Sequence, residues 1–103
     1  MKYTITNNRL KEIMEDYLNK ITHDSEATED DKTIRFYYDN EEDDNFGGLI
    51  FFYNKELNFL SLDSEMVSYF SKLFPPNRKE SQHFIGDWFS NKFGVTVESV
   101  LSL

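Results

Sequence analysis

The stretch GLIFFYNKELNFLSL, residues 48–62, holds two apolar segments separated by a short polar break. The first segment, 48–54, is apolar on both alternating sets of side chains, and the second, 56–62, is rich in Leu and Phe. Short runs of this composition favour strands, so the stretch predicts an antiparallel hairpin with a tight turn at Asn54 and Lys55. A strand that is apolar on both faces is normally covered on both. Strand 48–54 therefore requires helices on both sides of the sheet, or a partner on one side.

The segment TIRFYYD, residues 33–39, precedes this hairpin and is itself β-branched and aromatic, with Ile34, Phe36 and Tyr38 on one face. Together with the hairpin it predicts a three-stranded antiparallel meander. The tail VTVESVLSL, residues 95–103, alternates apolar and polar residues, which predicts a fourth strand, with a short helix as the alternative.

Three amphipathic segments predict helices: residues 6–20, residues 64–74, and a third that starts at a capping box of Asn77 and Glu80. The third helix is expected to bury Phe84, Ile85, Trp88, Phe89 and Phe93. The other expected capping and terminating residues are Thr6 or Asn7, Asp63 or Ser64, Pro75, Pro76 and Gly94. The sequence thus predicts an α+β fold in the order α-β-β-β-α-α-β, a small antiparallel sheet packed with three helices.

The composition limits the class of protein. A chain of 103 residues with 17% aromatic residues forms a single domain, 1–103, with ample material for a core. It has no cysteine, which excludes a disulfide framework and thiolate chemistry. Neither a secretory signal nor an apolar run of bilayer length is present, so we expect an intracellular protein with no membrane partner.

The formal net charge is −8, and all of it falls in one segment. Residues 23–45 hold ten acidic residues against Lys32 and Arg35, whereas the rest of the chain is neutral, with nine acids and nine bases. We expect residues 22–32 to form an exposed loop. A negative surface repels phosphate, which disfavours direct nucleic-acid binding. The candidate partner-binding groups form two clusters: Asp24, Glu26, Glu29, Asp30 and Asp31, and then Asp39, Glu41, Glu42, Asp43 and Asp44.

These clusters have three interpretations: a calcium loop, a nucleic-acid mimic and a solvated surface. A calcium loop of the EF-hand type needs glycine at its sixth position and glutamate at its twelfth, but counting from Asp39 these positions hold Asp44 and Ile50. We therefore expect no metal and no other cofactor. The clusters flank strand 33–39 and lie about 20 Å apart, a spacing that a mimic of duplex nucleic acid could use. The plainest interpretation is that these loops are solvated and keep an aromatic-rich domain soluble.

Catalysis has little support in the sequence. The chain contains no G-x-S-x-G, Walker A or H-E-x-x-H motif. His83 and Asp87 are spaced i, i+4 on the third predicted helix, but they have no third partner in view, so we interpret them as a surface pair. The segment PPN, residues 75–77, joins two helices as in a helix-turn-helix, yet the following helix lacks a basic stripe. We expect the protein not to be an enzyme.

Three segments carry a resemblance to known proteins: YTITNNRLKEIMEDYLNK, IFFYNKELNFLSLDSEMVSYFSKLF and FIGDWFSNKFGVTVESV. Taken in this order they resemble a loose group of small, functionally unassigned proteins from tailed bacteriophages. The likeness covers most of the chain except residues 22–45. It implies a phage origin and no catalytic residue.

We therefore expect a non-catalytic, phage-encoded protein that acts through protein–protein contacts, in the host cytoplasm or in the virion. It would be a small virion component or an inhibitor of a host system, with a protein as its partner, and both monomer and homodimer remain open. An acidic nucleic-acid mimic that blocks a host DNA- or RNA-binding enzyme is the alternative. A small enzyme of unknown class is the second alternative.

Overall fold

The computed structural model of the chain describes residues 7–38, 48–74 and 77–102. Over these residues the predicted α+β class is confirmed, and the predicted elements appear in their predicted order with one strand added between the first helix and the first predicted strand. The elements are α1 Asn7–His23, β1 Ser25–Glu29, β2 Thr33–Tyr38, β3 Leu49–Asn54, β4 Phe59–Leu62, α2 Ser64–Leu73, α3 Arg78–Phe93 and β5 Ser99–Ser102.

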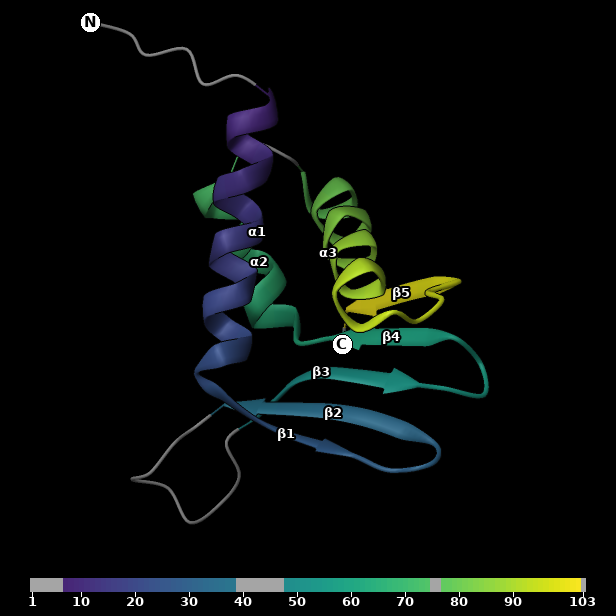
Figure 1. Ribbon diagram of the computed structural model, residues 1–103. Coiled ribbons are helices and arrows are strands. Elements are labelled where there is room, and N and C mark those ends of the chain that lie inside the picture. Colours follow the sequence, from purple (N-terminus) through teal and green to yellow (C-terminus); the bar gives the residue numbers. More distant parts are fainter. Residues whose placement is uncertain (1–6, 39–47, 75–76, 103) are drawn as a thin grey trace, which may run out of the picture.

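The strands form one sheet in the order β1–β2–β3–β4–β5 and lie side by side in that order (Figure 1). The first four strands pair antiparallel, whereas β5 pairs parallel with β4 and places Val100 opposite Leu60. The sheet is therefore mixed, and the prediction of an antiparallel sheet is wrong at this strand. The chain reaches β5 through α2 and α3, so these two helices set the direction of β5, which its own residues do not encode.

Strand β1 lies where the sequence predicted an exposed loop. Four of its five side chains are exposed, so it shows none of the apolar alternation that marks a strand. It forms because its backbone pairs with β2, from Ser25 opposite Tyr38 to Glu29 opposite Ile34. Helix α1 correspondingly runs to His23, beyond its predicted end, and leads directly into this edge strand.

A β-bulge in β3 changes which side chains face the core. Phe36 pairs with Phe51, but the next residue of β2 pairs with Leu49, so Ile50 has no partner on β2. A bulge re-aims a side chain, and Ile50 and Phe51 are both buried although they are neighbours. Phe52 lies on the opposite face and is half-buried. The bulge therefore explains the apolar residue at position 50, whereas Phe52 remains on the face away from the core.

The β3–β4 hairpin has a longer turn than the predicted two residues. Asn54 pairs with Phe59, which leaves residues 55–58 in the turn. The Oδ1 atom of Asn54 accepts hydrogen bonds from two backbone N–H groups of this turn, both at 2.9 Å. Asn58 has a positive φ of 51°, a conformation that Asn adopts more readily than most residues.

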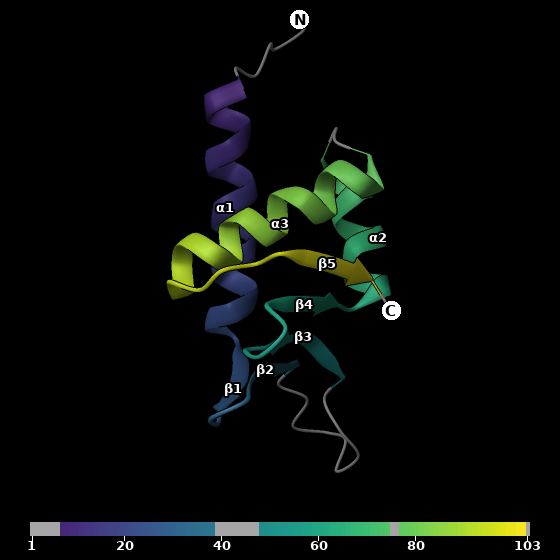
Figure 2. The ribbon, with the colours of Figure 1, turned by 90° about the vertical axis from the view of Figure 1, so that its right-hand side faces the viewer.

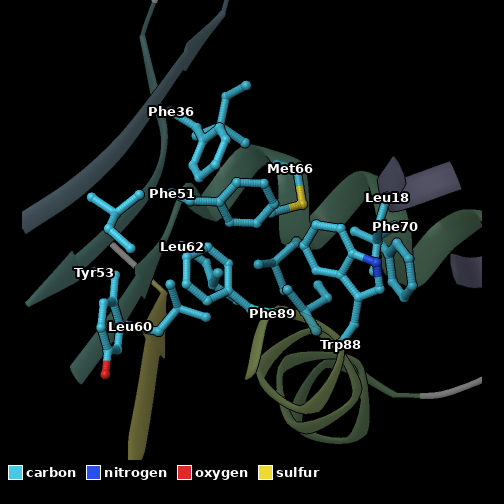
Figure 3. Packing of buried hydrophobic residues seen from close by; sticks show 14 of the residues in the cluster. Leu18, Phe36, Phe51, Tyr53, Leu60, Leu62, Met66, Phe70, Trp88 and Phe89 are labelled. Atoms are coloured by element: carbon cyan, nitrogen blue, oxygen red, sulfur yellow. The ribbon is translucent and has the colours of Figure 1, made fainter. Parts of the chain in front are cut away.

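One hydrophobic core lies between the sheet and the three helices. Figure 3 shows Phe51 and Leu62 pointing from the strands toward α3, which contributes Trp88 and Phe89. The predicted burial of Trp88 is confirmed, and its indole Nε1 donates a hydrogen bond of 3.1 Å to Oδ1 of Asn19 on α1. The buried residues are Met14, Leu18, Ile34, Phe36, Ile50, Phe51, Tyr53, Leu60, Leu62, Met66, Val67, Phe70, Ile85, Trp88 and Phe89.

The predicted caps of α2 and α3 are confirmed. The carboxylate of Asp63 accepts a hydrogen bond from the backbone N–H of Glu65, and Asn77 accepts one from Glu80 at 2.9 Å. Gly94 follows α3 with a positive φ of 64°, as expected of the residue that ends a helix. The predicted roles of Thr6, Pro75 and Pro76 and the last residue of the predicted fourth strand, Leu103, lie outside the described residues.

Candidate protein-contact face

The sheet carries a second apolar surface on the side away from the core. Side chains alternate along a strand, so the neighbours of the buried strand residues point to this side. Across the strands, Arg35 pairs with Phe52, Phe52 with Ser61, and Ser61 with Leu101. We call this surface the open face and define it by Glu26, Thr28, Arg35, Tyr37, Phe52, Phe59, Ser61 and Leu101.

The apolar residues of the open face are separate from the core. Tyr37, Phe52, Phe59 and Leu101 neither belong to the core cluster nor pack against it. Leu101 is 51% exposed, and the three aromatic residues are half-buried within the sheet. The buried residues of all three described helices join the core on the other side. Helices on both sides of the sheet are therefore not found in the described part of the chain, and the alternative of a partner on one side stays a prediction.

A positive charge lies in the middle of the open face. The guanidinium carbon of Arg35 is 5.2 Å from the centre of the Phe52 ring, within the range of a cation–π interaction. Arg35 is exposed, so its outer N–H groups face solvent. On the neighbouring strand β1, Thr28 lies opposite Arg35 and Glu26 lies opposite Tyr37. The open face is thus an aromatic and aliphatic surface with one cation at its centre and an acid at its edge.

The first acidic cluster follows the β1 edge of the sheet. Asp24 precedes β1, Glu26 and Glu29 belong to it, and Asp30 and Asp31 follow it; all five are exposed. The structure therefore brings the candidate acids of this cluster together, as a line along one strand and its two ends. Because β1 was predicted to be a loop, sequence reasoning missed that this line borders an apolar face.

Some of these acids have structural contacts. The Oδ1 atom of Asp30 accepts hydrogen bonds from the backbone N–H groups of Lys32, at 2.8 Å, and Thr33, at 2.7 Å. These backbone hydrogen bonds lower the pKa of the Asp30 carboxyl group below its usual value, so the turn favours its ionised form. The ammonium of Lys55 lies 3.8 Å from Glu29 and donates to the backbone oxygen of Asp30.

Two acids of the first cluster are unengaged. The carboxylates of Glu26 and Asp31 make no hydrogen bond or ion pair with another described residue, whereas the carboxylate of Asp24 lies 3.3 Å from the ring of His23. Glu26 and Asp31 are therefore the acids of this cluster that are best placed to meet a partner.

The second acidic cluster, Asp39, Glu41, Glu42, Asp43 and Asp44, lies outside the described residues. The predicted spacing between the clusters and the absence of a calcium loop consequently stay predictions. Within residues 7–38, 48–74 and 77–102, no three His, Asp or Glu side chains are grouped to hold a metal ion. None of the helices in this part of the chain is long and apolar enough to cross a bilayer.

A groove of about 960 Å³ borders α3 and is lined by Leu10 and Met14 of α1, by Trp88, and by Val100 of β5. His83 and Asp87 also line this groove, where Nε2 of His83 lies 3.5 Å from Oδ2 of Asp87. Both side chains are well exposed, at 83% and 70%. No hydrogen bond joins this pair to a third side chain among the described residues, so it has the geometry of the predicted surface pair.

No protein-family model, no curated protein and no solved structure matches this chain. The resemblance to small phage proteins therefore stays a prediction. The open-face residue that sequence reasoning missed most completely is Leu101. The alternating tail placed it in a strand, but only the parallel pairing of β5 brings it opposite Ser61 and into line with Phe52.

Proposed function

We propose that this chain is a non-catalytic protein-binding module that uses the open face to contact another protein. The observation that supports it is a group of apolar side chains, Tyr37, Phe52, Phe59 and Leu101, that lies outside the core on a sheet face without a described helix over it. Exposed apolar surface rimmed by polar residues is typical of interaction sites. Aromatic residues and arginine are also the residues most enriched at such interfaces.

The charges around the open face specify the chemistry of the partner. The β1 edge is acidic, with Glu26 and Asp31 unengaged, so a matching partner carries basic side chains beside its apolar patch. The central cation, Arg35, needs an acceptor on the partner, either a carboxylate or a backbone carbonyl group. A second copy of this chain fits less well, because stacking the two β1 edges would bring like charges together.

The size of the open face indicates a modest affinity. Five strands about 4.8 Å apart and about five residues long make a plane of roughly 400 Å². A stable interface buries about 800 Å² on each partner, so this face alone is about half of what such an interface needs. The contact therefore either extends onto the acidic edge or is transient.

A phage-encoded binding module of this kind would act as a small virion component or as an inhibitor of a host system. Mass spectrometry of purified particles separates these two roles, since only a virion component is packaged. An acidic mimic of nucleic acid is the second candidate, and the exposed acids along β1 favour it. In that case the β1 acids would carry binding by themselves, without Leu101 or Phe52.

The experiment uses Leu101→Gln and Phe52→Gln as open-face variants and Leu57→Gln as the matched control. Leu57 is 68% exposed but lies in the β3–β4 turn, away from the open face. Proteins captured from a host lysate are purified, and their affinity for each variant is measured by calorimetry, after circular dichroism has established that the variant is folded.

We expect the open-face variants to weaken binding at least tenfold and the control to bind like the wild type. Binding that survives both open-face variants but is lost on Glu26→Gln with Asp31→Asn would instead support the nucleic-acid mimic. Equal loss of binding in the Leu57→Gln control would contradict the assignment of the open face.

A further inference from the structure

A cluster of polar side chains lies at the opposite edge of the sheet from β1, where α2, α3 and β5 meet. Arg78, the first residue of α3, extends its guanidinium group to three serine hydroxyls. Its Nη1 donates to Ser68 Oγ at 2.6 Å, and its Nη2 donates to Ser64 Oγ at 2.7 Å and Ser102 Oγ at 3.1 Å. Figure 2 shows why these residues meet, since β5 ends beside α2.

The positive charge of Arg78 is not neutralised by an ion pair with any described residue. Its hydrogen-bond acceptors among the described residues are neutral oxygens of Ser64, Ser68 and Ser102. The carboxylate of Asp63, which is adjacent to Ser64 in the sequence, accepts a hydrogen bond of 2.8 Å from the Tyr38 hydroxyl instead. An uncompensated guanidinium is notable in a chain whose net charge is −8.

The cluster also has more hydrogen-bond donors than acceptors. A serine hydroxyl that accepts a hydrogen bond still has its own O–H to donate. Ser102 Oγ accepts from Arg78 and also from Gln82 Nε2 at 2.7 Å. None of the three hydroxyls donates to another described residue, so three O–H groups, two from α2 and one from β5, surround a cation. A ligand that only accepts hydrogen bonds and carries negative charge would complement this arrangement.

We propose that Arg78, Ser64, Ser68 and Ser102 form a binding site for a phosphate group. A tetrahedral oxyanion has enough oxygens to accept from the guanidinium group and from hydroxyls of both α2 and β5 at once, whereas a carboxylate has two. The phosphate group comes either from a small molecule or from a phosphorylated side chain of a protein. The site is independent of the open face.

The test is a titration of the folded, isotope-labelled chain with inorganic phosphate, followed by amide NMR shifts at constant ionic strength. We expect saturable shifts with a millimolar Kd, centred on Ser64, Ser68, Arg78 and Ser102. Arg78→Gln should abolish saturation, while Arg9→Gln, which neutralises an exposed arginine on α1, should leave it unchanged. Acetate should shift these amides at least fivefold less than phosphate at the same concentration.

Arg78 also ties three elements together, so Arg78→Gln can destabilise the fold. Ser68→Ala keeps the cation and removes one donor, and should weaken phosphate binding several-fold while the chain stays folded. A purely structural role for Arg78 predicts no saturable phosphate shifts at all, and that result would overturn the proposal. Equal shifts with acetate, or unchanged binding in both variants, would overturn it as well.

The source of the phosphate group is distinguished with a phosphoserine peptide and its unphosphorylated form. Binding of the phosphopeptide at least tenfold tighter than inorganic phosphate assigns the site to a phosphorylated protein. Equal affinities assign it to a small phosphate compound. Both results require that the unphosphorylated peptide does not compete for the site.

Discussion

Replacement of Gly86 by alanine tests the parallel strand that the sequence did not predict. Gly86 is buried on α3, and a methyl group there would lie 2.7 Å from Cγ2 of Val100 and 3.7 Å from Cγ1 of Val97. Carbon atoms in normal contact are about 3.5–4.0 Å apart, so Val100 or α3 must move by about 1 Å. Such overpacking costs about 1–3 kcal/mol, and the helix gains about 1 kcal/mol when glycine becomes alanine. We expect Gly86→Ala to lower the free energy of unfolding by about 1 kcal/mol.

The second substitution, Val100→Ala, removes the group that clashes. Alone, this substitution should lower the free energy of unfolding by about 1 kcal/mol, because two methyl groups of a half-buried side chain are lost. In the double variant the clash disappears and the helix gain remains, so its stability should be close to that of the wild type. The coupling between the two sites is then about 2 kcal/mol in the stabilising direction.

The assay is urea unfolding followed by the fluorescence of Trp88, the one tryptophan of the chain. Gly94→Ala serves as the matched control. Gly94 has a positive φ and no atom within 4 Å of the position of an added methyl group, so its substitution costs strain that Val100→Ala does not relieve. Additive effects of Gly86→Ala and Val100→Ala, within about 0.5 kcal/mol, would show that β5 does not pack on α3 at this point.

Three further predictions concern single side chains. Trp88→Ala should lower the free energy of unfolding, measured by urea unfolding, by about 3–5 kcal/mol, because it empties a buried site and removes the hydrogen bond to Asn19. A loss under about 1 kcal/mol would mean that the indole is not buried. Burial, and then the hydrogen bond to Asp63, raise the pKa of Tyr38, so its neutral hydroxyl stabilises the fold fully below about pH 10 and this contribution is lost as the pH rises further. Tyr38→Phe should therefore reduce the fall of the melting temperature as the pH rises above about 10. An unchanged dependence of the melting temperature on pH would contradict the role of the Tyr38 hydroxyl. The pKa of Asp30 is lowered, so its effect on stability depends on pH in the opposite direction. The ionised Asp30 carboxylate stabilises the fold above about pH 4, and this stabilisation is lost as the pH falls through the pKa of the folded state. Asp30→Ala should thus reduce the melting temperature at pH 7 more than in acid. Asp30→Asn keeps a side-chain oxygen that can accept hydrogen bonds, so it should retain much of the turn. Equal effects of the two variants at pH 7 would contradict the role of the Oδ1 acceptor.

Local sequence signals predicted most of the elements because each signal acts over a few residues. Asp63 and Asn77 accept hydrogen bonds from the first turn of the helix that each one caps, and the burial of Trp88 follows from the apolar spacing of its helix. Strand β1 could not be predicted in this way. Four of its five side chains are exposed, and the backbone hydrogen bonds that form it leave no mark on residue type.

The candidate site was predictable only in part. The acids of residues 24–31 were identified as candidate contact groups, but the apolar surface that they border was not, since it arises from the register of five strands. The apolar character of both sides of strand 48–54 was the one signal that pointed to it. The bulge at Ile50 accounts for part of that signal, and Phe52 accounts for the rest.

The parallel pairing of β5 with β4 determines when the sheet can be completed during synthesis on the ribosome. Strands β1 to β4 can associate once residue 62 has emerged, but the outer edge of β4 stays unpaired until residues 99–102 have been added. At about 5–20 residues per second, this leaves the edge exposed for a time on the order of seconds. An unpaired strand edge invites pairing with other chains. Translation speed through α2 and α3 therefore sets the time during which the nascent chain can mispair, and slow codons there should reduce the yield of folded protein more than slow codons in the meander.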